Sequence, residues 1–75
     1  MILSTTIDLG PDPDCESCFR DLRYSYDPKR DVHQVSICGC RFDDIYTGTK
    51  GEMANVIAPF RGNPGIDELF SWLCR

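Results

Sequence analysis

Four cysteines in two close pairs are the residues of this sequence best suited to chemistry. Two residues separate Cys15 from Cys18, one separates Cys38 from Cys40, and nineteen lie between the pairs. Two close pairs on either side of a chain reversal allow a short chain to place four thiolates about 2.3 Å from one Zn²⁺. The sequence therefore predicts a structural zinc site whose ligands are Cys15, Cys18, Cys38 and Cys40.

His33 is an alternative to Cys40 as the fourth zinc ligand, because neutral imidazole also binds zinc. It precedes Cys38 by five residues, which is about 16 Å in an extended strand. We therefore expect His33 to lie on the surface instead. Cys74, the fifth cysteine, lies near the end of the sequence, where we expect it to be a small buried residue of a helix.

Two other states of the cysteines stay open, disulfide bonds after export and buried thiols without metal. Residues 1–9 contain no Lys or Arg and lack the long apolar run of a secretory signal. An odd number of cysteines also cannot all pair within one chain. We therefore expect a cytoplasmic location, where reducing conditions favour thiolates that bind metal.

The same residues offer little for catalysis. Cys15-Glu16-Ser17-Cys18 has the spacing of a redox motif, but no βαβ unit surrounds it. Four thiolates around zinc would leave no coordination position for a substrate or water. The glycines near Gly62 and Gly65 lack the Lys-Ser/Thr of a phosphate-binding loop. We expect a protein that is not an enzyme.

Three segments alternate apolar and polar residues with the period of a β-strand. They cover residues 2–9, 22–26 and 33–37. Between the last two, Asp27-Pro28-Lys29-Arg30 is typical of a turn. The sequence therefore predicts an N-terminal strand followed by a hairpin that has one cysteine pair at the foot of each arm.

A helix is predicted after Asn63, which can act as the N-cap, because Pro64 suits the first helical position. Its apolar stripe consists of Ile66, Leu69, Phe70, Leu73 and Cys74. Gly48-Thr49-Lys50-Gly51 predicts a turn, and residues 53–59 suit a strand or a helix. The expected fold is a small α+β domain covering residues 1–75, with a zinc-ribbon-like hairpin, an N-terminal strand and a C-terminal helix.

Composition limits the partners of this domain. The chain has 75 residues, 41% of them hydrophobic, and a formal net charge of −4. A negative net charge disfavours binding to a phosphate backbone and favours binding to a basic face of another protein. We therefore expect a larger protein as the partner and no membrane association. The alternative is nucleic-acid binding by the basic and aromatic residues of the hairpin, which are Arg20, Arg23, Tyr24, Tyr26, Lys29 and Arg30.

The order of these motifs resembles zinc ribbons. Cys15-Glu16-Ser17-Cys18, Cys38-Gly39-Cys40 and the terminal Ile66-Asp67-Glu68-Leu69-Phe70-Ser71-Trp72-Leu73 are also similar to the restriction-alleviation family of phages and prophages. The similarity covers roughly residues 15–75. It implies a layout of cysteine pair, hairpin, cysteine pair and helix, and a role in modulating a restriction enzyme. The chain differs from the family at Phe19, where the first knuckle favours Gly, and in its shorter second knuckle.

Overall fold

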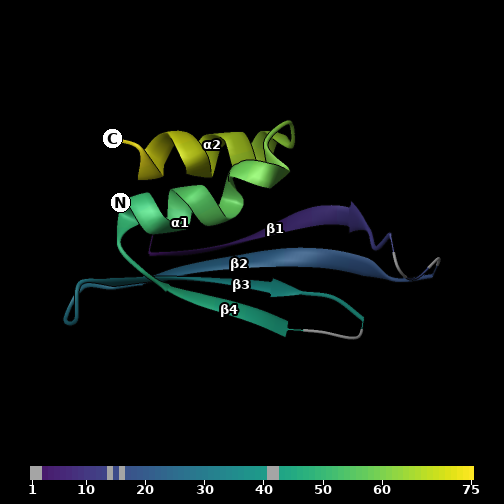
Figure 1. Cartoon of the computed structure of the whole chain (residues 1–75), viewed down its shortest axis with the longest axis horizontal. Helices are drawn as coiled ribbons and strands as arrows, with labels where there is room; N and C mark the ends of the chain where they lie inside the picture. The colour runs from purple at the N-terminus through teal and green to yellow at the C-terminus, as the bar shows by residue number, and fades with distance from the viewer. Residues whose placement is uncertain (1–2, 14, 16, 41–42) are drawn as a thin grey trace.

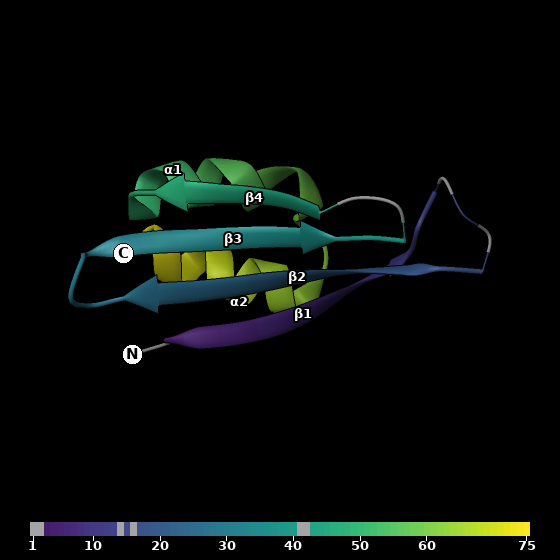
Figure 2. The same cartoon turned by 90° about the horizontal axis from the view of Figure 1, so that it is seen from below.

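A computed structural model describes residues 3–13, 15, 17–40 and 43–75. Its strands are β1 (Ser4–Pro11), β2 (Phe19–Asp27), β3 (Val32–Cys38) and β4 (Asp43–Gly48), and its helices are α1 (Lys50–Ile57), the short 3₁₀ helix η1 (Ala58–Phe60) and α2 (Pro64–Leu73). The strands form one antiparallel sheet in the order β1-β2-β3-β4, and α1 and α2 cover one of its faces (Figures 1 and 2). The expected α+β fold is confirmed, with its N-terminal strand, hairpin and C-terminal helix.

This sheet order decides where the connections lie. Each strand pairs with the next one along the chain, so the β1–β2 and β3–β4 connections lie at one end of the sheet. The β2–β3 turn lies at the other end (Figure 1). Cysteines that are far apart in the sequence are therefore carried to the same end, which is called the cysteine end below.

The core lies between the sheet and the two helices. Leu22 of β2 pairs with Ile7 of β1 and with Ile37 of β3, and all three side chains are buried on the helix face. Alternate residues on the other face are mostly polar, which explains the period of two in the sequence. The remaining buried hydrophobic residues are Tyr24, Val35, Met53, Ala54, Ile57, Ile66, Leu69 and Leu73.

The segment around Thr49 differs from the sequence prediction. Gly48 ends β4 and Lys50 begins α1, so the predicted turn over residues 48–51 is wrong. Thr49 is the N-cap: its Oγ1 accepts the backbone N–H of Glu52 at 3.2 Å, and its own N–H donates to Glu52 Oε1 at 3.1 Å. This reciprocal capping box resolves the ambiguous residues that follow in favour of a helix.

Replacing Thr49 with alanine is expected to lower the free energy of unfolding by about 0.5–2 kcal/mol, since the backbone N–H of Glu52 loses its acceptor. Thr49→Ser keeps a hydroxyl at the same place and should stay close to the wild type. Urea unfolding of the three proteins measures the difference. Equal losses for both variants would show that the cap contributes nothing.

A bend in β1 leads into the first cysteine loop. The pairing of β1 with β2 shifts between Asp8 and Gly10, and Gly10 has a φ of +86°, which a glycine adopts without strain. Asn63, 55 positions further along the chain, stabilises this bend. Its Nδ2 donates to the Asp8 carbonyl at 2.7 Å, while its Oδ1 accepts the Gly65 N–H at 2.9 Å as the N-cap of α2. The start of α2 is thus tied to the strand that positions the cysteines.

The C-terminal end of α2 differs from the sequence prediction for Cys74. Leu73 is the last helical residue and is buried, whereas Cys74 is exposed. The prediction that Cys74 is buried was wrong because the residue follows the end of the helix, past the part that packs on the sheet. Trp72, by contrast, packs edge-on against Tyr24, with ring centroids 5.7 Å apart. None of the helices in the described part of the chain is long and apolar enough to cross a membrane.

Candidate metal centre

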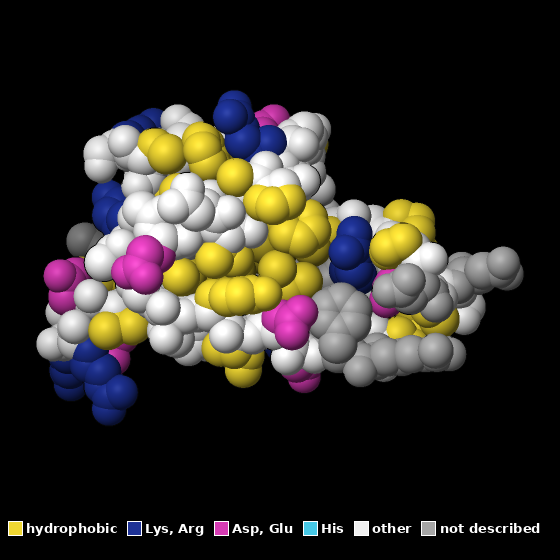
Figure 3. All heavy atoms as spheres, in the orientation of Figure 1, with side chains coloured by type: hydrophobic (Ala, Val, Ile, Leu, Met, Phe, Trp, Pro, Cys, Tyr) yellow, Lys and Arg dark blue, Asp and Glu magenta, His cyan; other side chains and the backbone are white. Residues whose placement is uncertain are grey.

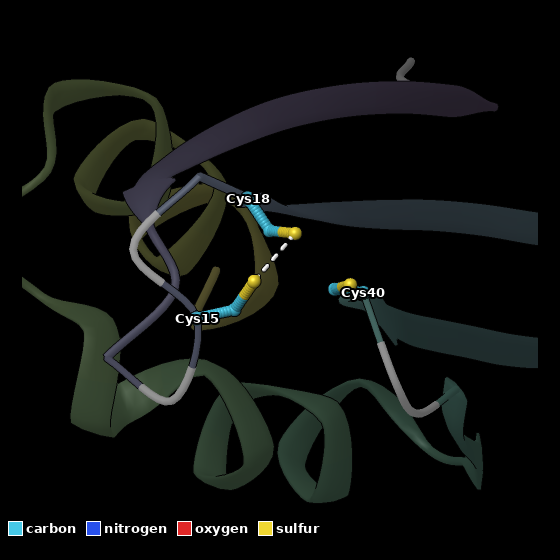
Figure 4. A group of neighbouring side chains, drawn as sticks. All are labelled: Cys15, Cys18 and Cys40. Atoms are coloured by element: carbon cyan, nitrogen blue, oxygen red, sulfur yellow. Dashed lines mark hydrogen bonds between the residues drawn. The ribbon is translucent and has the colours of Figure 1, made fainter.

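Three thiols gather at the cysteine end. The Sγ atoms of Cys15, Cys18 and Cys40 all lie within 4.8 Å of one another. Cys15 and Cys18 come from the β1–β2 connection, and Cys40 comes from the β3–β4 connection (Figure 4). A tetrahedron of sulfurs around zinc separates neighbouring sulfurs by about 3.8 Å, since each lies about 2.3 Å from the metal. The three atoms can therefore hold one metal ion.

Backbone hydrogen bonds fix the loop that presents the first two thiols. The Asp12 N–H donates to the Cys18 carbonyl at 2.9 Å, which closes the loop at its base. Within it, the Cys15 N–H donates to the Asp12 carbonyl at 3.2 Å, and the Cys18 N–H donates to the Cys15 carbonyl at 3.3 Å. These bonds turn the chain so that the two sulfurs point toward each other (Figure 4).

The closest pair of thiols shares a hydrogen bond. Cys15 Sγ and Cys18 Sγ are 2.7 Å apart. This bond with Cys18 lowers the pKa of Cys15, and the backbone N–H of Ser17 lowers it further. The same bond with Cys15, followed by the contact with Cys40 and by burial, raises the pKa of Cys18 to about 12. One thiolate is thus favoured, and a second ionises readily only if a cation compensates the added negative charge.

Cys38, the fourth predicted ligand, is placed differently. It is the last residue of β3, and its Sγ lies 3.5 Å from Ser36 Oγ, on the face of the sheet opposite to Val35 and Ile37. Its sulfur does not belong to the group formed by the other three thiols among the described residues. The structure therefore brings together three of the four predicted ligands, and the role of Cys38 stays a prediction.

His33 is not on the surface, so that expectation was wrong. It begins the same alternation as Val35 and Ile37, and it faces the helices with only 5% of its surface exposed. Its Nδ1 shares a 2.6 Å hydrogen bond with the Tyr24 hydroxyl, and its ring stacks on Tyr26 with centroids 4.4 Å apart. His33 lies near the opposite end of β3 from Cys38 and is not part of the thiol group.

Two charged residues, Asp31 and Lys50, lie near the buried imidazole of His33. Burial lowers the pKa of His33; the charge of Lys50 lowers it further, and that of Asp31 partly opposes both. Asp31 accepts a hydrogen bond from the Tyr26 hydroxyl at 2.9 Å. Lys50 Nζ lies 4.6 Å from the centre of the Trp72 ring. The folded protein therefore favours a neutral His33.

Acidification is expected to weaken the fold through His33. The unfolded chain takes up a proton near pH 6.5, whereas the folded chain does so only at lower pH. This contribution is complete above pH 6.5 and is lost as the pH falls from 6.5 toward the folded pKa. Urea unfolding of the zinc-treated protein at pH 7.5 and 5.5 measures the loss. The double variant Y24F/H33F removes both partners of the hydrogen bond and should lose less stability than the wild type; an equal loss would contradict the prediction.

The tyrosines of the alternative nucleic-acid site lie on the helix face. Tyr24 is only 1% exposed and is bonded to His33, so it offers no ring face to a base. Tyr26 is partly buried and stacks on the same imidazole. Base stacking needs exposed aromatic faces, and these two rings are already engaged within the protein.

The basic residues of that alternative are dispersed. Arg23 points to the outer face of the sheet and pairs with Asp21 at 3.2 Å. Arg30 and Lys29 lie at the β2–β3 turn, where Arg30 is 3.9 Å from Asp27. Arg20 lies near the cysteine end, with its guanidinium 5.6 Å from the centre of the Phe60 ring. The six residues therefore do not gather on one surface.

Comparisons with known proteins leave the family open. No family model matches the chain, and neither a curated protein nor a solved structure is found to match it. The resemblance to zinc ribbons and to restriction-alleviation proteins thus stays a prediction from the sequence. The thiol group itself is compatible with a zinc site, and the chain contains a possible metal-binding cysteine cluster.

Proposed function

We propose that this chain is a small zinc-binding domain that acts by binding a larger protein and has no enzymatic activity. The observation that carries the proposal is the approach of Cys15, Cys18 and Cys40 within 4.8 Å at one end of the sheet. Three ionised thiols so close together would repel one another strongly unless a cation neutralised them. Zinc is the preferred metal because thiolates are its usual ligands in structural sites.

Cys38 is our candidate for the fourth ligand. It lies two residues before Cys40, and its sulfur is 3.5 Å from the Ser36 hydroxyl, a contact that metal binding could replace. A fourth thiolate would close the coordination shell and make the site structural. In the Cys38→Ser variant, zinc affinity should fall by at least tenfold. An unchanged affinity would exclude Cys38 from the shell.

Mass spectrometry under native and denaturing conditions, together with metal analysis, tests the zinc site directly. We expect one zinc ion per chain in the native spectrum and its loss on denaturation. The five thiols should then all alkylate without prior reduction. A folded protein that contains no metal would contradict the proposal, and so would a chain whose thiols stay blocked until a reductant is added.

The net charge of −4 supports a protein partner with a basic face. Among such partners we propose a host enzyme, because the motifs resemble those of restriction-alleviation proteins. We also propose a cytoplasmic location, where thiols stay reduced. Cross-linking of the zinc-bound domain, followed by identification of the proteins linked to it, tests the proposed partner. Failure to recover any protein partner would count against the adaptor role.

A further inference from the structure

An open groove lies on the helix face of the sheet, between the end of α1 and strands β3 and β4. Its volume is about 350 Å³, at the lower end of the range for ligand sites. Hydrophobic side chains gather on this face of the molecule between α1 and β4 (Figure 3). The groove is lined by Arg20, Ile37, Asp44, Tyr46, Val56, Pro59 and Phe60.

Arg20 is the cation of this groove, and it forms no ion pair within the part of the chain that the structure describes. Its Nε is buried and has no hydrogen-bond partner among the described residues. The ion pairs seen in the described chain use three other arginines, Arg23, Arg30 and Arg61. The contact of Arg20 is with the ring of Phe60. A buried guanidinium N–H is stabilised by an acceptor, and a carboxylate is the acceptor that best matches its charge and shape.

The other walls of the groove define the rest of the ligand. Ile37, Val56, Pro59 and Phe60 present apolar surface, so the carboxylate must belong to a ligand with an apolar body. Asp44 also lines the groove, and among the ion pairs of the described residues none joins it to Arg20. Its negative charge weakens the attraction for a carboxylate and disfavours ligands with several.

The strand beside the groove favours a protein segment over a free small acid. β4 is an edge strand of the sheet, so its outward backbone groups have no partner strand among the described residues. An extended segment can bond to such an edge while its side chains enter an adjacent pocket. Tyr46 of β4 lines the groove and stays 41% exposed, which extends the apolar surface along the strand.

We propose that this groove binds a segment of the partner protein in which a large apolar side chain lies next to a carboxylate, with the carboxylate on Arg20 and the apolar side chain against Phe60 and Val56. The inference rests on the proposed protein-binding function and names the chemistry of the partner. It does not depend on which metal the cysteines hold.

Amide NMR titration of the full chain, purified with its metal, tests the site with 3-phenylpropionate and its neutral amide as probes. The acid should shift the signals of Ile37, Val56 and Phe60 and bind at least tenfold more tightly than the amide. Arg20→Gln should remove this preference. Arg23→Gln, three residues along the same strand and therefore on the outer face, should keep it. Equal binding of acid and amide, or equal effects of the two arginine variants, would overturn the proposal.

Two further measurements complete the test. Asp44→Asn leaves Arg20 in place and should tighten binding of the acid; unchanged or weaker binding would count against the site. A nine-residue peptide with Glu beside Phe should bind at least tenfold more tightly than 3-phenylpropionate, and weaker binding would favour a free acid and overturn the assignment to a protein segment. Metal analysis of the same samples separates the outcomes, because a metal-free folded chain that still binds the peptide would refute the zinc centre alone.

Discussion

Replacing Cys18 with serine is expected to leave the chain unfolded at neutral pH even when zinc is in excess. Structural zinc contributes an apparent binding free energy of about 10–16 kcal/mol in small domains, and this energy is available for folding. The hydrophobic core of a domain this small supplies about 3–5 kcal/mol at most. Loss of one thiolate from the group of Cys15, Cys18 and Cys40 therefore removes the larger contribution. Far-ultraviolet circular dichroism and the dispersion of amide NMR signals measure the result.

Cys74→Ser is the matched control, since it makes the same chemical change at an exposed position after α2. It should keep the fold and one zinc ion per chain. Cys15→Ser and Cys40→Ser should behave like the Cys18 variant, and removal of zinc from the wild type with a chelator should give the same unfolded spectrum. A Cys18 variant that is folded like the wild type would show that the thiol group does not maintain the fold.

Replacing Leu22 with alanine should cause the second largest loss of folding stability. This side chain is fully buried at the centre of the sheet, between its paired neighbours Ile7 and Ile37. Replacing a buried leucine with alanine costs about 2–5 kcal/mol, because the cavity that remains is only partly filled by relaxation. Chemical unfolding of the zinc-bound protein measures this loss. The next residue provides the control: Arg23→Ala, on the exposed outer face, should cost about 1 kcal/mol or less.

Leu22→Ala should also weaken zinc binding, although Leu22 is not a candidate ligand. If the chain folds only when it binds zinc, every loss in folding free energy appears as weaker apparent zinc binding. A loss of about 2–5 kcal/mol then raises the apparent Kd for zinc roughly 30- to 4,000-fold. Competition with a chromophoric chelator measures it. An unchanged affinity for Leu22→Ala would mean that the thiol loops bind metal independently of the core.

Those parts of the fold that have a strong periodic pattern could be predicted from the sequence. The hairpin followed from apolar residues at alternate positions, and α2 followed from Asn63 and Pro64 at its start. β4 gave no such signal, because its side chains are exposed on both faces, apart from Gly48 at its end. For α1, the signal was present in the spacing of Thr49 and Glu52, but the two nearby glycines suggested a turn instead.

The candidate metal centre could be predicted from the sequence only in part. The spacing of the cysteines indicated which residues could meet, and the order of the strands explains why Cys40 reaches Cys15 and Cys18. Spacing alone does not say which face of a strand a residue occupies, so the position of Cys38 could not be predicted. The groove around Arg20 had no sequence signal either, since its walls come from β2, β3, β4, α1 and η1.

The bond between Asn63 and Asp8 has a consequence for synthesis on the ribosome. Its two residues are 55 positions apart, so the bend before the first cysteine loop gains this anchor only after the start of α2 has emerged. A nascent chain that ends before Asn63 would hold its first two thiols on a loosely fixed loop. Efficient zinc capture is therefore expected only after Asn63 has left the ribosome.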